Sequence, residues 1–165
     1  MRRIGRAFLA LALALGLGAQ DTRVVLVRHG EKASKAPDTE LSDLGRRRAE
    51  ALAGELLPLG PAVLYATERR RTQETLAPLA RKLGLTLQVK PPEDSPGTAR
   101  EILARHRGKV VVVCGHSDTL ADLAAGLGFP GDFPPVTGYD GLWVLDWPGG
   151  QGPPHLKARV QAFRP

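Results

Sequence analysis

The sequence predicts an α/β fold, a three-layer sandwich in which a mainly parallel central sheet carries helices on both faces. Short β-branched segments alternate along the chain with longer segments of helical periodicity. Residues 24–27 and 110–113 are apolar without polar alternation, which is typical of strands buried on both faces. The 165 residues, 42% hydrophobic and 24% charged, suit one compact domain with an ordinary core.

Each element follows from local signals. The predicted strands span residues 24–27, 62–66, 85–89, 109–114, 141–147 and 156–163. Between them, helices are predicted over residues 43–57, 72–83, 98–106 and 118–127, with a loop at 91–97. Ser42 is expected to cap the first helix, and Pro58 and Gly60 to end it. Pro78 falls inside the second helix, where a proline can bend the chain.

The first twenty residues differ from the rest. Arg2, Arg3 and Arg6 precede an apolar run at 7–18, which is the pattern of a secretory signal peptide. We therefore expect a leader at 1–20, a domain at 21–165, and a secreted or periplasmic protein. The run is shorter than the roughly 20 residues that a transmembrane helix needs, although an uncleaved anchor remains the alternative. No membrane span is expected after leader cleavage.

The charge does not favour a nucleic-acid partner. The net charge is +6, and removal of the three leader arginines leaves +3. With only 5% aromatic residues, the chain offers few platforms for base stacking. Cys114 is the only cysteine, so an intrachain disulfide is excluded, and its position after four valines predicts a buried thiol.

Basic residues follow three of the predicted strands. Arg28 and His29 follow the first strand, three consecutive arginines at 69–71 lie shortly after the second, and His116 follows the strand at 109–114. Because the carboxyl ends of parallel strands meet at one edge of a sheet, these side chains are expected to converge. A neutral imidazole is a good nucleophile, and the planar arginine fork matches phosphate. Phosphoryl transfer through a histidine nitrogen needs this combination.

Four sequence blocks carry a family resemblance: Arg28-His29-Gly30, Leu41-Ser42 with Gly45 and Arg48-Ala49, Arg71-Thr72-Gln73-Glu74-Thr75, and Gly115-His116-Ser117. In this order and spacing, between about residues 24 and 127, they resemble the histidine phosphatase superfamily, also called phosphoglycerate mutase-like. The short chain and the Gly-His-Ser-Asp-Thr segment look closer to small bacterial phosphatases than to glycolytic mutases.

The resemblance implies a role for each site residue. His29 is the expected phosphoryl acceptor, Arg28 and Arg71 bind the phosphate, and His116 is the second histidine of the pocket. Gly30 is expected among the phosphate-binding residues because glycine permits close backbone approach to a ligand. No metal and no cofactor are expected, and the implied substrate is a small phosphorylated molecule.

The proton donor to the leaving alcohol stays open between Glu93, Asp94 and Asp118. A relative without such an acid would be restricted to good leaving groups, such as phosphohistidine or phenolic esters.

Three alternatives compete with hydrolysis through a histidine. A mutase must keep its phosphorylated intermediate under a lid, and the chain has no long insertion at 30–41 or 84–108 to build one. A non-catalytic phosphate-ligand binding module would not need both His29 and His116. A metal hydrolase is disfavoured because the four histidines have no ligand-like spacing. The loops at 31–40 and 129–140 are expected to determine the substrate; oligomeric state does not follow from the sequence.

Overall fold

The computed structural model describes residues 21–150 and 152–161. Within them lies a six-stranded sheet in the order β3-β2-β4-β1-β5-β6. The strands are β1 (Thr22–Arg28), β2 (Val63–Thr67), β3 (Leu87–Lys90), β4 (Val110–Gly115), β5 (Gly141–Trp147) and β6 (His155–Val160). Strands β1 to β4 pair in parallel, whereas β5 and β6 are antiparallel additions beside β1. The predicted leader at 1–20 lies outside the described residues.

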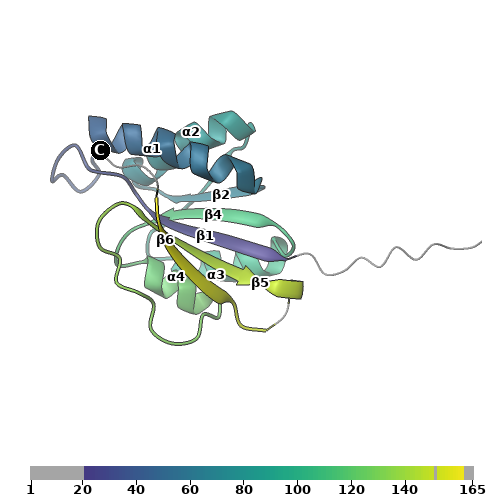
Figure 1. Cartoon of the computed structure of the whole chain (residues 1–165). Helices are drawn as coiled ribbons and strands as arrows, with labels where there is room; N and C mark the ends of the chain where they lie inside the picture. The colour runs from purple at the N-terminus through teal and green to yellow at the C-terminus, as the bar shows by residue number, and fades with distance from the viewer. Residues whose placement is uncertain (1–20, 151, 162–165) are drawn as a thin grey trace, which may run out of the picture.

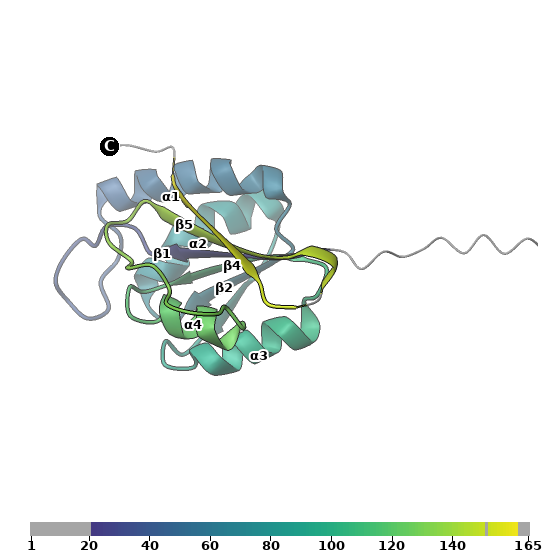
Figure 2. The same cartoon turned by 60° about the horizontal axis from the view of Figure 1, so that its bottom comes forward.

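Helices cover both faces of the sheet, as predicted. They are α1 (Asp43–Leu56), α2 (Arg70–Leu83), α3 (Ser95–Arg105) and α4 (Leu120–Gly126), with short 3₁₀ turns η1 (Leu57–Leu59) and η2 (Pro148–Gly150). The helices α1 and α2 lie over one face, and α3 and α4 over the other (Figures 1 and 2).

The core forms on both sides of the sheet because alternate residues of each strand point to opposite faces. In β1, Val25 and Val27 pack with α1 and α2, whereas Val24 and Leu26 pack with α3 and α4. All four side chains are fully buried. The continuous apolar run read from the sequence therefore reports a strand covered on both faces.

Several predicted boundaries shift in the structure. Helix α3 begins at Ser95, inside the predicted loop at 91–97, because the Asp94 side chain accepts a hydrogen bond from the Gly97 N–H and Pro96 suits the first turn. Helix α2 begins two residues early and runs through Pro78 without a break. The strand predicted at 156–163 begins at His155 and ends at Val160.

Other local signals are confirmed. The Ser42 hydroxyl accepts a hydrogen bond from the Gly45 N–H and caps α1. Helix α2 ends at Gly84, whose φ of 66° is a left-handed conformation that favours glycine. Over residues 21–150 and 152–161, no helix combines the length and the hydrophobicity needed to cross a bilayer.

Candidate active site

The two histidines meet where β1 and β4 end. Arg28 and Gly115 are partners in the parallel register, and the His29 N–H donates to the Gly115 carbonyl over 3.1 Å. This pairing places His29 and His116, each one residue beyond its strand, with ring centroids 5.3 Å apart. The two side chains are only 4% and 7% exposed. The expected convergence of strand ends therefore occurs.

His29 is held through one ring nitrogen. Its Nδ1 lies 2.7 Å from the Gly30 carbonyl oxygen. A carbonyl only accepts, so Nδ1 carries the proton and Nε2 keeps its lone pair. Burial lowers the pKa of His29 to about 4; the bond to Gly30 opposes this shift, and the charge of Arg71 adds to it. At neutral pH the ring is uncharged, which a nitrogen nucleophile requires.

His116 is held through both ring nitrogens. Its Nε2 lies 3.0 Å from the Thr67 hydroxyl oxygen, and its Nδ1 lies 3.4 Å from Arg71 Nη2. A guanidinium only donates, so Nδ1 accepts and Nε2 carries the proton toward Thr67. Burial lowers the pKa of His116 to about 4, and the charge of Arg71 adds to the shift. Both imidazoles are therefore neutral at neutral pH.

The two arginines are anchored by backbone carbonyls. Arg28 donates from Nη1 to the Gly138 carbonyl over 2.8 Å, and Arg71 donates from Nη1 to the Pro37 carbonyl over 2.7 Å. The Nε atoms of both are buried without a hydrogen-bond partner among the described residues. Unsatisfied buried donors are uncommon, and an arginine fork suits two oxygens of a phosphoryl group.

These side chains line an open cleft of about 430 Å³. Its walls are formed by Arg28, His29, Lys32, Arg69, Arg71, Pro92, Glu93, His116, Ser117, Asp118 and Thr119. The structure thus brings together the four residues expected to act on phosphate. Two of the three candidate acids, Glu93 and Asp118, line the cleft, whereas Asp94 caps α3.

Gly30 lies between the nucleophile segment expected at His29 and helix α1. It does not line the cleft, and both of its backbone polar groups have protein partners: the N–H donates to Thr75 Oγ1 over 3.0 Å, and the carbonyl accepts from His29. A Cβ at this position would lie 3.1 Å from the Gly45 carbonyl oxygen. Gly30 therefore permits close packing of α1 against the segment that carries His29, and its contact with phosphate stays a prediction.

An ion pair supports the same segment. Arg48 donates from Nη2 to Glu31 Oε1 over 2.6 Å, and the two side chains are 8% and 16% exposed. The guanidinium holds the pKa of the Glu31 carboxyl below its usual range against the opposing effect of burial. The pair ties α1 to the residue that follows Gly30. Helical spacing indicates that Arg48 is buried, because it places Arg48 on the same face of the helix as Gly45 and Leu52.

Tyr139 also contacts the site, and no sequence pattern predicted this contact. Its ring centroid is 5.9 Å from that of His29, and the Arg28 guanidinium carbon lies 4.4 Å from the Tyr139 centroid. Tyr139 lies in a Pro/Gly-rich loop more than a hundred residues beyond Arg28. Among residues 21–150 and 152–161, no three His, Cys, Asp or Glu side chains gather as metal ligands.

The sequence is similar to known phosphatases. The model of the histidine phosphatase superfamily (branch 1) matches residues 24–92. The 8-oxo-(d)GTP phosphatase of Mycolicibacterium smegmatis is 38% identical over 78 residues, which are 43% of this chain and 24% of that protein. The matches span from 15% to 33% of the length of the first curated relatives.

Solved structures share the fold over most of the chain. Mycobacterial glucosyl-3-phosphoglycerate phosphatase superposes with a TM-score of 0.67 at 20% identity, covering 86% of this chain and 98% of that one. The protein histidine phosphatase SixA, complexed with tungstate, gives a TM-score of 0.69 at 17% identity, covering 84% and 97%. The segment matched by the family model contains Arg28, His29 and Arg71. His116 lies outside this segment, directly after β4. Residues 24–92 are thus similar in sequence to the histidine phosphatase superfamily (branch 1), and the fold is that of solved phosphatase structures.

Proposed function

We propose that this chain is a phosphatase that hydrolyses phosphomonoesters, or phosphohistidine, through a phosphohistidine intermediate on His29. The observation that carries the proposal is the state of the His29 ring. It is uncharged, its Nδ1 is bonded to the Gly30 carbonyl, and it lies in a cleft that also contains Arg28 and Arg71. The ring therefore has a lone pair on Nε2 beside two phosphate-binding side chains.

In the first step, the lone pair of Nε2 attacks phosphorus in line with the leaving oxygen. The P–N bond forms, the P–O bond breaks, and the electron pair leaves on the oxygen. The negative charge of the phosphoryl group spreads over its equatorial oxygens, where the forks of Arg28 and Arg71 bind it. Catalysis is then mostly positioning and electrostatic stabilisation.

His116 contributes through its Nδ1. In the absence of substrate, this nitrogen accepts a hydrogen bond from Arg71. A phosphoryl dianion beside the ring offsets the charge of Arg71 and favours protonation of His116. The imidazolium then donates to a phosphoryl oxygen while Nε2 keeps its bond to Thr67.

The leaving oxygen takes its proton from Glu93 or Asp118, the carboxyl groups of the cleft. In the second step, water attacks the phosphohistidine, the P–N bond breaks, and its electron pair returns to Nε2. The proton released by the water goes to the same carboxylate, which restores the acid for the next turnover. Orthophosphate is the second product.

The cleft also favours an anionic substrate. Lys32 and Arg69 line it, and neither side chain has an ion-pair or hydrogen-bond partner among the described residues. Named relatives of similar fold act on glucosyl-3-phosphoglycerate or are protein histidine phosphatases. We propose a small phosphorylated molecule as the substrate, no metal in the reaction, and a place outside the cytoplasm on the basis of the leader.

Labelling of the intermediate tests this function. Protein given ³²P-labelled aryl phosphate and quenched in alkali should carry label on His29, because a phosphoramidate survives base and is labile in acid. His29→Ala should abolish turnover, and His116→Ala should slow it by roughly 10²–10³-fold, the effect of losing one charge-stabilising donor.

The exposed His155 provides the matched control, since His155→Ala should keep both the label and the turnover. Near-normal turnover in His29→Ala would contradict the mechanism. Phosphate binding without any label or turnover would instead favour a binding module.

A further inference from the structure

Tyr139, which lies outside the segment matched by the family model, contacts Arg28, the arginine proposed to bind phosphate. The Arg28 guanidinium carbon lies 4.4 Å from the centroid of the Tyr139 ring, at cation–π distance. The same guanidinium donates from Nη1 to the carbonyl of Gly138, the neighbouring residue. Arg28 is thus held from two sides by consecutive residues of one loop.

That loop is itself fixed to the end of the sheet. The Gln161 side chain is 2% exposed and donates to the Tyr139 carbonyl over 3.2 Å, while the Gln161 N–H donates to the Asp140 carbonyl over 2.6 Å. Gly138 has a φ of 68°, a left-handed conformation that a residue with a side chain rarely adopts. These contacts set the position of the Tyr139 backbone.

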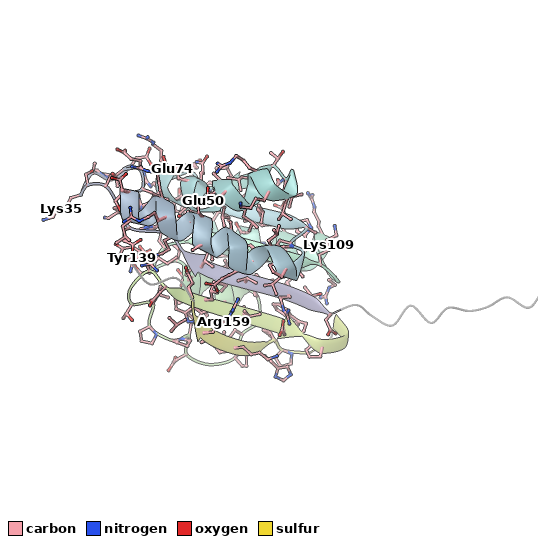
Figure 3. All side chains as sticks on the ribbon, turned by 45° about the horizontal axis from the view of Figure 1, so that its top comes forward. Lys35, Glu50, Glu74, Lys109, Tyr139 and Arg159 are labelled. Carbon is pink, nitrogen blue, oxygen red and sulfur yellow. The ribbon has the colours of Figure 1, made fainter. Side chains whose placement is uncertain are left out.

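The ring also lies beside the nucleophile, with its centroid 5.9 Å from that of His29. Figure 3 places Tyr139 at the same end of the molecule as Lys35, whose loop leads from His29 to α1, and far from Lys109, the residue before β4. Tyr139 is therefore at the edge of the sheet where the phosphate-binding side chains gather.

We infer that Tyr139 is a positioning residue that holds Arg28 in the orientation that binds the phosphoryl group. The inference rests on the proposed function. Nη1 of Arg28 is occupied by Gly138 and one face of the guanidinium by the ring, so the edge formed by Nε and Nη2 is left for two phosphoryl oxygens. Without the ring, Arg28 gains rotamers that face away from His29, and phosphate binding must then restrict them.

Replacement of the ring tests the inference. Tyr139→Leu removes the aromatic face but keeps an apolar side chain, and Tyr139→Phe keeps the face but removes the hydroxyl. Calorimetric titration with orthophosphate should show affinity roughly three- to thirtyfold weaker in Tyr139→Leu, the range expected for loss of a cation–π contact. Tyr139→Phe should remain within about threefold of the wild type, because a phenyl ring also attracts the guanidinium. The KM for an aryl phosphate should rise in parallel in Tyr139→Leu.

Thr137→Ala is the matched control, because Thr137 is exposed in the same loop and its side chain has no recorded partner among the described residues. It should bind orthophosphate as the wild type does. Wild-type affinity in Tyr139→Leu, or an equal loss in Tyr139→Phe or Thr137→Ala, would overturn the inference.

The outcome separates this inference from the proposed function. Label on His29 together with unchanged affinity in Tyr139→Leu would overturn the role of Tyr139 alone. Weaker orthophosphate binding in Tyr139→Leu, in a protein that shows no turnover, would overturn the phosphatase assignment alone. A wild type that binds no orthophosphate would overturn both.

Discussion

His29 and His116 present different ring nitrogens to the protein. Nδ1 of His29 donates to a backbone carbonyl, whereas Nδ1 of His116 accepts from Arg71 and its Nε2 donates to Thr67. The tautomers are therefore opposite, which suits one ring for attack and the other for a donor role that depends on the arrival of an anion. Two residues of the same type gain distinct chemistry from their hydrogen-bond partners.

The lowered pKa values predict how the two rings titrate. In phosphate-free buffer, both His29 and His116 should remain neutral well below the ordinary histidine pKa of about 6.5, and should take up protons only near pH 4. Ring ¹⁵N shifts measured by NMR should also show the proton on Nδ1 of His29 and on Nε2 of His116. Titration of either ring near the ordinary value would contradict this prediction.

The same shifts fix the direction of the stability change. Between the unfolded pKa of about 6.5 and the folded value of about 4, the unfolded chain binds more protons, so the free energy of unfolding falls as the pH falls. His29→Gln removes one of the two groups. Denaturant unfolding of this variant should therefore depend less steeply on pH across that interval.

Among the elements, α1 makes several contacts with the segment that carries His29. The Ser42 N–H donates to the Glu31 carbonyl over 2.8 Å, and a Cβ on Gly45 would collide with the same carbonyl. The Glu31–Arg48 pair adds a second tie between this helix and the segment after His29. These contacts give a physical reason for the spacing of Ser42, Gly45 and Arg48 in the second sequence block.

The cap of α3 predicts a change in stability without a change in activity. Asp94→Ala removes the hydrogen bond to the Gly97 N–H and should lower the free energy of unfolding by about 1 kcal/mol, whereas Asp94→Asn should keep most of it. Turnover of alkyl phosphates should be preserved in both variants, measured beside unfolding in denaturant.

The turnover of Asp94→Ala is compared with that of variants of the two carboxyl groups in the cleft, Glu93 and Asp118. Replacement of the true proton donor, by Glu93→Gln or Asp118→Asn, should slow alkyl esters more than aryl esters, because a phenolate is stable enough to leave without a proton and an alkoxide is not. A selective loss for alkyl esters in Asp94→Ala would show that the cap residue also serves as the acid.

At the scale of the whole molecule, the sheet order produces the site. Because β4 lies between β2 and β1, the ends of three parallel strands bring Thr67, His116 and His29 together. The antiparallel β5 lies on the other side of β1, so the loop before it returns Tyr139 to the same end. The site thus draws on both the parallel and the antiparallel parts of the sheet.

This arrangement predicts turnover that does not depend on a metal. In the proposed mechanism, Arg28, Arg71 and His116 supply the charge that stabilises the phosphoryl group, so dialysis against a chelator should leave the rate of aryl phosphate hydrolysis unchanged. The measurement compares chelated protein with and without added divalent cations. Loss of activity that returns on addition of a metal would contradict the mechanism.

The sequence by itself determined the fold class, the strands after which the site residues follow, and the four residues that meet at the cleft. Hydrophobic periodicity is a local property, and it indicates buried strands such as Val24–Val27 wherever the chain places them. Since parallel strands end at one edge, Arg28, His29 and His116 were predictable from their positions after strands, whereas Arg71 was selected from three consecutive arginines only by the family resemblance. The cleavage and export implied by the leader stay predictions.

Only the tertiary structure decided which groups touch one another. It packed Gly30 against α1, fixed the tautomers of both rings, and brought Tyr139 to Arg28. Each of these outcomes depends on the packing of segments distant in sequence or on the direction of single hydrogen bonds. Local pattern carries no information about either, because contacts of this kind form only when the layers of the domain assemble.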